Sequence, residues 1–141
     1  MYSVYPACFY KEENGYSVIF PDLNYLATSG ETLESALSMA VDCLAGYLYW
    51  LDKDGEKRPA ASALNNVNAE ELAKELDFEY SECFVNVITV DVNEFAKTHF
   101  EKSVRKNLTI PAWLNEMALR ENINFSQVLQ DALIKQLNIS F

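Results

Sequence analysis

The chain has 141 residues, half of them hydrophobic, and carries a formal net charge of -10. This length is enough for one ordinary domain or two small ones with buried cores. No apolar run reaches the roughly 18 residues of a membrane helix, and Lys11, Glu12 and Glu13 interrupt the segment where a secretion signal would lie, so we expect a cytoplasmic protein without membrane contact.

The N-terminal segment predicts a β-hairpin. Two runs rich in aromatic and β-branched residues, 2–11 and 16–20, flank Asn14-Gly15, the dipeptide best suited to the positive φ angles of a type I′ turn. Pro21-Asp22 then ends the second strand, and residues 23–28 are expected to form a third, shorter strand.

From Thr32 onward the apolar residues recur at helical spacing. This pattern predicts one helix over residues 32–52, with Thr32 as its N-cap, followed by a loop and by a short helix that Asn68 caps. The segment "CFVNVITVDV" alternates as a strand, and residues 93–102 form a short helix or a linker. Residues 1–96 therefore predict a small α+β domain, in which a long helix lies on one face of a mainly antiparallel sheet.

The segment "SVRKNLTIP" predicts a strand over residues 103–110. Alternation places Leu108 and Ile110 on an apolar face and Arg105, Asn107 and Thr109 on the opposite face, while Lys106 fits the apolar set only near a frayed strand end. Pro111 suits the first turn of a helix, and Asn124 can cap a second helix.

A strand and two short helices cannot bury a core alone, because roughly 40 residues are too few. Pairing about a two-fold axis would turn two such strands into an antiparallel ribbon and bury the apolar faces of four helices. Residues 97–141 are therefore expected to form a dimeric module. Its expected dimer contacts are apolar residues of the strand and both helices: Leu108, Ile110, Trp113, Leu114, Val128 and Leu129.

The outward face of this ribbon has the chemistry of a DNA reader. The major groove admits a two-stranded ribbon, in which Arg105 can pair with guanine and Asn107 with adenine, while Thr109 can offer its hydroxyl or its methyl, with Lys106 beside them. The N–H groups of Phe125 and Ser126, at the start of the second helix, are expected to hold a backbone phosphate.

The charge is distributed unevenly along the chain. Residues 1–96 contain 5 Lys/Arg and 17 Asp/Glu, a balance of -12, whereas residues 97–141 contain 6 and 4, a balance of +2. Lys97, Lys102, Arg105 and Lys106 cluster at the start of the second part. This asymmetry suggests two different partners, but charge alone is equally compatible with a solvated acidic surface and an ordinary C-terminal hairpin.

The chain offers no pattern typical of an enzyme. His99 has no catalytic or metal-ligating residue at suitable spacing, and Asp22, Glu31 and Asp42 show no arrangement that would bring them together around metal ions. Cys8, Cys43 and Cys83 lack the close pairing of zinc or redox motifs, so we expect three reduced thiols. The sequence predicts no catalytic residues, metal or cofactor.

Three blocks in this order resemble the HicB antitoxin family: "YPACFYKEENGYSVIFPDL", "TLESALSMAVDCLAGYL", and "VRKNLTIPAWLNEMA" with "INFSQVLQDAL". The resemblance implies a degenerate ribonuclease H-like domain without activity, which neutralises a small basic mRNA-cleaving toxin of the HicA type. It further implies a C-terminal ribbon-helix-helix dimer that represses the operon promoter. Toxin contacts are expected at Tyr16, Pro21, Asp22 and Leu23, and residues 55–82 match no motif of the family.

Two other functions stay open at this stage. One is a transcription regulator whose N-terminal domain senses a small molecule, and the other is an RNA-binding or nuclease-like protein. The sequence does not specify the operator bases, the toxin-facing residues in detail, or whether homodimers pair further into tetramers.

Overall fold

The computed structural model describes residues 1–101 and 103–138, so Lys102, one of the predicted basic cluster, lies outside the described part. The chain forms two compact units, Met1–Lys102 and Ser103–Phe141. The division falls later than the predicted one after Ala96, because the helix around Phe95 packs onto the core of the first unit.

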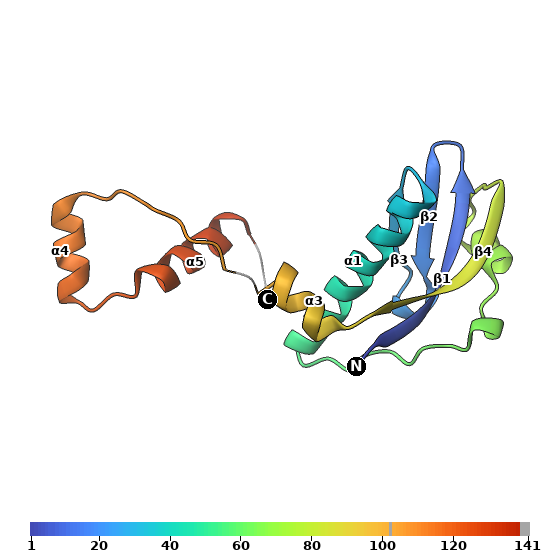
Figure 1. Ribbon diagram of the computed structural model, residues 1–141, viewed down its shortest axis with the longest axis horizontal. Helices are drawn as coiled ribbons and strands as arrows, with labels where there is room; N and C mark the ends of the chain where they lie inside the picture. Colours follow the sequence, from blue (N-terminus) through green and yellow to red (C-terminus); the bar gives the residue numbers. More distant parts are fainter. Residues whose placement is uncertain (102, 139–141) are drawn as a thin grey trace. The chain divides into compact units, whose positions relative to one another are not determined.

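The predicted α+β class is confirmed, with helices and strands arranged as in Figure 1. The first unit contains β1 (Ser3–Glu12), β2 (Gly15–Phe20), a 3₁₀ turn (Pro21–Leu23), β3 (Leu26–Gly30), α1 (Leu33–Lys53), a second 3₁₀ turn (Leu64–Asn66), α2 (Ala69–Leu76), β4 (Glu82–Val90) and α3 (Val92–His99). The second unit contains α4 (Ala112–Arg120) and α5 (Phe125–Gln136). Within the described ranges, no helix has the length and apolarity needed to cross a membrane.

The four strands form one antiparallel sheet in the order β3-β2-β1-β4. The predicted hairpin is present, but its turn lies one residue earlier than expected: Glu12 pairs with Gly15, which leaves Glu13 and Asn14 as the two turn residues. Gly15 has φ 145°, and a Cβ there would collide with the carbonyl oxygen of Gly30. The glycine is therefore required by the close approach of β3 rather than by a type I′ turn.

The third strand starts later than the sequence predicted, at Leu26. Pro21 begins a 3₁₀ turn, and the two residues that follow it, Asn24 and Tyr25, have positive φ angles of 57° and 59°. Asparagine tolerates this left-handed conformation, whereas an aromatic residue rarely adopts it. The left-handed pair redirects the chain and delays the strand.

One face of the sheet packs against α1, which Figure 1 shows lying along it. The predicted N-cap is confirmed: Thr32 accepts a hydrogen bond from the Ser35 N–H at 3.1 Å, and the Thr32 N–H donates to Ser35 Oγ at 3.0 Å. This reciprocal pair satisfies two N–H groups that the first helical turn would leave free. The core on this face consists of Tyr5, Ala7, Phe9, Val18, Phe20, Leu23, Ala36, Ala40, Leu44, Ala45, Leu48, Ile88, Val90 and Val92.

The opposite face of the sheet is also covered, which the sequence did not predict. Residues Cys8, Tyr10 and Ile19 pack against α2, where Ala69, Leu72 and Ala73 are buried. The Tyr10 hydroxyl donates a 2.7 Å hydrogen bond to the carbonyl of Ala69, and burial raises the pKa of this phenol. The fold is thus a three-layer arrangement of α1, sheet and α2 rather than a sheet with one covered face.

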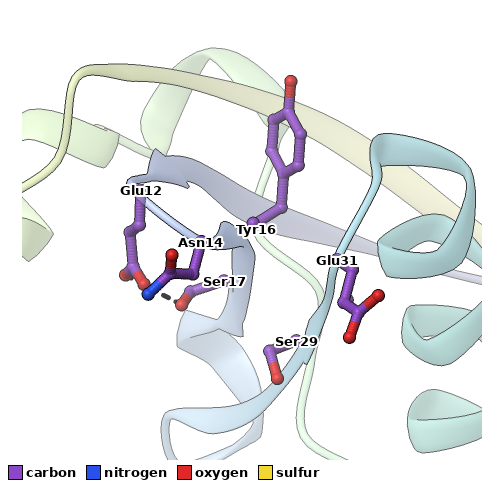
Figure 2. A pocket seen from close by; sticks show the side chains of 8 residues that line it. Glu12, Asn14, Tyr16, Ser17, Ser29 and Glu31 are labelled. Carbon is purple, nitrogen blue, oxygen red and sulfur yellow. Dashed lines mark hydrogen bonds between the residues drawn. The ribbon is translucent and has the colours of Figure 1, made fainter.

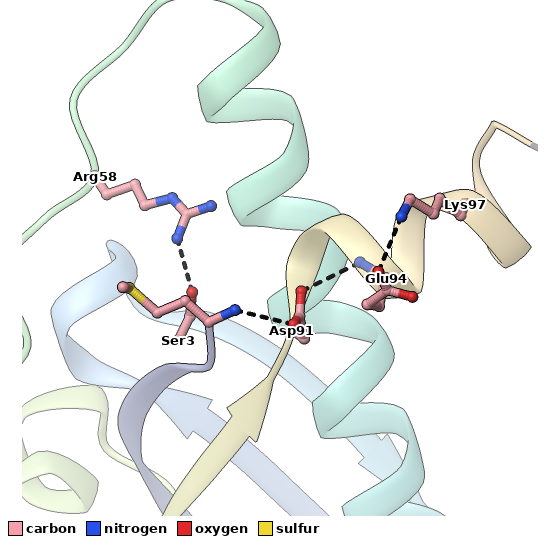
Figure 3. A network of polar contacts seen from close by, with 6 residues as sticks. Ser3, Arg58, Asp91, Glu94 and Lys97 are labelled. Carbon is pink, nitrogen blue, oxygen red and sulfur yellow. Dashed lines mark hydrogen bonds and ion pairs between the residues drawn. The ribbon is translucent and has the colours of Figure 1, made fainter.

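Polar contacts hold the ends of the first unit (Figure 3). The Asp91 carboxylate accepts hydrogen bonds from the Glu94 N–H at 3.2 Å and from the amino group of Met1 at 3.1 Å. Both contacts lower the pKa of Asp91, and the hydrogen bond from the Glu94 N–H is the larger cause. Nearby, the Arg58 guanidinium bridges Ser3 and the Asp52 carboxylate, with its closest approach to the latter at 2.6 Å.

The second unit consists of a non-helical segment followed by α4 and α5. Residues 103–111 contain no assigned strand, although Figure 1 draws them as an elongated stretch. The predicted strand at 103–110 therefore has no pairing partner within the described part of this chain. This is the expected result if its ladder is completed by a second chain, because a strand is assigned only where a neighbour bonds to it.

Candidate functional site

Residues 103–110, the basic segment of the second unit, line two hollows together with residues of α5. Lys106, Leu108 and Ile110 line a hollow of about 410 Å³ together with Phe125 and Leu129. The even-numbered residues thus share one side of the segment, as the predicted alternation requires. Asn107 and Thr109, which belong to the predicted base-reading set, are exposed.

The alternation is lost at the N-terminal end of the segment. Arg105 and Lys106 both line a second hollow, of about 560 Å³, with Gln130 and Leu133. Arg105 is exposed and carries no ion pair among the described residues. A guanidinium in this state is available to an external acceptor such as a phosphate or a guanine.

The first turn of α5 contains backbone N–H groups that differ in whether they have a hydrogen-bond partner. Asn124 caps the helix as predicted, accepting the Gln127 N–H at 3.1 Å, and the Val128 N–H bonds to the Asn124 carbonyl at 3.0 Å. Within the described residues, the N–H groups of Phe125 and Ser126 have no such partner. Free N–H groups at the positive end of a helix attract an anion.

The apolar residues of the second unit are uncovered. None of residues 103–138 is buried, and the exposed fraction of Leu108 is 66%, that of Trp113 63% and that of Val128 53%. Leu129 is the most protected predicted dimer contact, at intermediate exposure. The large apolar residues exposed in this unit are Val104, Leu108, Ile110, Trp113, Leu114, Met117, Leu119, Ile123, Phe125, Val128, Leu133 and Leu137.

The predicted toxin contacts differ in accessibility. Tyr16 is half-buried against the α1-side core, and Pro21 is also half-buried. The Asp22 carboxylate accepts two hydrogen bonds from Ser62, from its N–H and its hydroxyl, each 2.7 Å long. Leu23 is fully buried, because the 3₁₀ turn directs it into the core, so its predicted role as a surface contact is corrected.

Two of the hollows on the surface of the first unit include predicted toxin contacts in their lining, and the sequence did not anticipate either hollow. One, of about 180 Å³, is lined by Asp22 and the exposed Tyr25, with Glu71 and Glu75 from α2. No motif marked Tyr25; the only sequence signal was the Asn that precedes it. This hollow joins an aromatic ring to several carboxylates, a combination that can bind a cationic side chain.

The other hollow, of about 350 Å³, lies at the tip of the β1–β2 hairpin (Figure 2). Glu12, Ser17 and Glu31 contribute polar groups, and the Ser17 hydroxyl donates to Glu12 at 2.8 Å. Figure 2 shows the Tyr16 ring pointing away from Glu12 and Ser17, as strand alternation requires. The hollow is acidic, since Glu12 and Glu31 line it and both are exposed.

Acidic, histidine and cysteine side chains do not gather in the described residues. These residues contain no cluster of three or more His, Cys, Asp or Glu side chains suited to a metal ion, so Asp22, Glu31 and Asp42 do not form one. The His99 ring stacks on Phe95 at 3.8 Å, and its Nδ1 lies 3.0 Å from the Phe95 carbonyl.

The three cysteines are free thiols. Cys8 is buried and Cys43 and Cys83 are half-buried, and burial raises the pKa of Cys8 and of Cys43. A raised pKa keeps a thiol protonated and unreactive.

Comparison with known proteins gives consistent matches. Residues 5–133 match a family model described as the HicB-like antitoxin of bacterial toxin-antitoxin systems. A 48-residue segment is 46% identical to antitoxin HicB 1 of Photorhabdus laumondii, spanning 34% of this chain and 31% of the relative.

Solved structures agree with this match. A toxin-antitoxin complex from Streptococcus pneumoniae contains a chain that is 30% identical, with a TM-score of 0.68 over 96% of this chain and 99% of the other. The Burkholderia pseudomallei antitoxin HicB, 21% identical, shares the fold, with a TM-score of 0.51 over 98% of both chains.

Proposed function

This chain belongs to the HicB-like antitoxin family, and on that premise we propose that it binds and neutralises a small mRNA-cleaving toxin of the HicA type and, as a dimer, represses its own operon in the cytoplasm. The observation that carries the proposal is the contrast within the chain. An acidic unit with its own core is joined to a unit that exposes its apolar faces beside Arg105 and Asn107.

The toxin-binding role is assigned to the first unit. Its charge, -12 over residues 1–96, favours rapid capture of a basic protein. We propose that the unit is a degenerate ribonuclease H-like domain without activity, since its described carboxylates do not gather around a metal site. Binding rather than catalysis would then be its whole contribution.

The DNA-binding role is assigned to the second unit. Two copies paired about a two-fold axis would supply each other with the missing ladder, forming a ribbon from residues 103–110. Leu108, Ile110 and the apolar faces of α4 and α5 would then be buried, giving a ribbon-helix-helix dimer.

The ribbon would present Arg105, Asn107 and Thr109 to the base edges. The free N–H groups of Phe125 and Ser126 would meet a phosphate beside the groove and fix the register. The proposed phosphate contact is supported by the N–H groups of Phe125 and Ser126, which have no backbone partner among the described residues.

Operator binding is tested with the double variant Arg105→Ala and Asn107→Ala, by gel shift at fixed salt on promoter DNA. We expect loss of sequence-specific binding with dimer formation retained, because both side chains are exposed. The matched control is Lys135→Ala with Gln136→Ala, which removes the same charge from the end of α5. Unchanged operator affinity in the first variant would contradict the assignment of these residues.

Toxin neutralisation is tested by adding the purified chain to an RNA cleavage reaction run by the HicA-type toxin from the same operon. Inhibition at equimolar protein supports the antitoxin role. Cleavage of RNA by the chain alone in the presence of Mg²⁺ would instead favour the nuclease-like alternative.

A further inference from the structure

The sheet has two edges, and they are protected unequally. At one edge, β3 has five residues and lies beneath α1, where the Cys43 thiol donates to the Ala27 carbonyl at 4.0 Å. At the other edge, β4 has nine residues and pairs only with β1. A long free edge invites another strand unless it is blocked, commonly by lysine or proline, and β4 contains neither.

The backbone of β4 shows which groups face outward. The Val87 N–H donates a 2.9 Å hydrogen bond to the side-chain oxygen of its own neighbour Asn86. Its register partner is Pro6, which has no N–H to exchange, so this is a non-hydrogen-bonded pair. By alternation, Cys83, Val85, Val87 and Thr89 direct their N–H and C=O groups away from the sheet.

Among the described residues, no backbone hydrogen bond occupies these outward groups. The hydrogen bond that the Val87 N–H donates to Asn86 engages a side chain and not another strand. Apolar surface accompanies the edge, since 39% of Phe84 and 40% of Val87 is exposed. Phe84 is held in place by stacking on Phe9, with the ring centroids 4.9 Å apart. The edge thus combines open ladder positions with exposed apolar side chains.

The charge beside the edge indicates the chemistry of its occupant. A hollow of about 590 Å³ borders the first half of β4, and its lining contains Glu70 and Glu71 but no lysine or arginine. Glu82, at the start of the strand, is exposed as well. A second copy would bring the same carboxylates together, and two units that each carry a large negative charge repel each other. A basic strand meets no such repulsion.

We propose that the free edge of β4 receives an extended segment of the toxin as a fifth strand, with its cationic side chains beside Glu70, Glu71 and Glu82. This inference rests on the proposed function and adds the location and the mode of contact. Main-chain bonds to the odd-numbered residues give the affinity, and the carboxylates select a basic strand.

The first test is hydrogen exchange of the full-length chain, alone and with the HicA-type toxin of the same operon, inactivated at its catalytic residue. The amides of Cys83, Val85 and Thr89 should exchange quickly in the free protein and slowly in the complex. Those of Phe84 and Ile88, which bond to β1, should be protected in both. Fast exchange at the odd positions in the complex would overturn the proposal.

The second test uses Val87→Pro, which removes an outward N–H without removing a bond to β1. Toxin affinity should fall by at least about tenfold. Glu70→Lys with Glu82→Lys should weaken binding similarly without touching the backbone, whereas Asp54→Lys with Glu56→Lys, equal in charge change and away from β4, should not. Full affinity of the Glu70 and Glu82 double variant would count against the basic strand, even if Val87→Pro failed to fold.

The outcomes separate the two proposals. If the unaltered chain does not bind the toxin, the proposed function fails. If it binds and the odd-numbered amides stay exposed, only the β4 proposal fails. Protection of those amides in the free protein that disappears on dilution would assign the edge to a second copy and overturn the proposal.

Discussion

The two units of this chain use similar local signals but differ in what they bury. The first unit covers both faces of its sheet, and residues such as Phe9, Tyr10 and Leu44 are fully buried. In the second unit, none of residues 103–138 is buried, although Asn124 caps α5 and both helices carry apolar residues at helical spacing. Caps and periodicity therefore make helices in both units, but only the first has the tertiary contacts that would hold it alone.

The contrast assigns different sources of stability to the two units. The first should unfold in a transition that is independent of protein concentration. The second should gain its stability from association, because its folded monomer leaves large apolar side chains in water. The following experiments test this contrast, beginning with the largest expected effect.

Leu44→Ala should destabilise the first unit by about 2–5 kcal/mol, because it removes a fully buried side chain and leaves a cavity. The measurement is denaturant unfolding followed by tyrosine fluorescence. Leu64→Ala, at a residue that is 44% exposed in the same unit, is the control and should change little. If the loss of stability caused by Leu44→Ala varied with protein concentration, the first unit would not be stable on its own, and the contrast between the units would fail.

Tenfold dilution should destabilise the second unit by about 1.4 kcal/mol and leave the first unchanged, because only dimerisation obeys mass action. Calorimetry over a range of concentrations measures this as a shift of one melting transition. If both transitions keep their midpoints, the second unit folds as a monomer and its exposed apolar residues need another explanation.

The two asparagine caps offer a matched pair. Asn68 accepts the Glu71 N–H and Asn124 accepts the Gln127 N–H, both at 3.1 Å. Each change to alanine should cost about 1 kcal/mol of stability. Asn68→Ala should lower the first transition at every concentration, and Asn124→Ala the second, most visibly in dilute solution. If Asn68→Ala lowered the second transition, or Asn124→Ala the first, the division of the chain into these two units would be contradicted.

Asp91→Asn should have the smallest effect, and it should depend on pH. The folded pKa of Asp91 is lowered, so its ionised form stabilises the fold above the unfolded pKa, about 3.9, and this contribution is lost as the pH falls through the folded value. Asparagine keeps the cap but not the charge. The wild-type advantage in melting temperature should therefore be present at neutral pH and vanish near pH 2; an advantage that persisted there would contradict the ionic cause.

Prediction from sequence succeeded where local rules decide the structure. The apolar face of α1 and the caps at Thr32, Asn68 and Asn124 depend only on residues close in sequence, and the sequence predicted all of them. The delayed start of β3 was missed, because a left-handed tyrosine is not signalled by propensity. The cover of the second sheet face was missed because residues 55–68 have no period, although Asp22 and Ser62 hold this connection in place.

The candidate sites divide in the same way. Arg105, Asn107 and Thr109 could be proposed from alternation alone, whereas Leu23 was misplaced because a 3₁₀ turn sends it inward. The free edge of β4 could not be read from its own residues. Whether a strand is central or outermost depends on the order β3-β2-β1-β4, which only the assembled sheet reveals.

The hairpin tip carries an implication for how this sequence can change over time. Gly15 lies against the carbonyl of Gly30, and a Cβ on Gly30 would meet the backbone of Ala36 at the start of α1. Each obstruction is backbone, so substitution of one glycine cannot make room for a side chain at the other. We expect the two positions to stay glycine independently in descendants that keep this fold, whereas the adjoining Glu13 and Asn14 are free to drift.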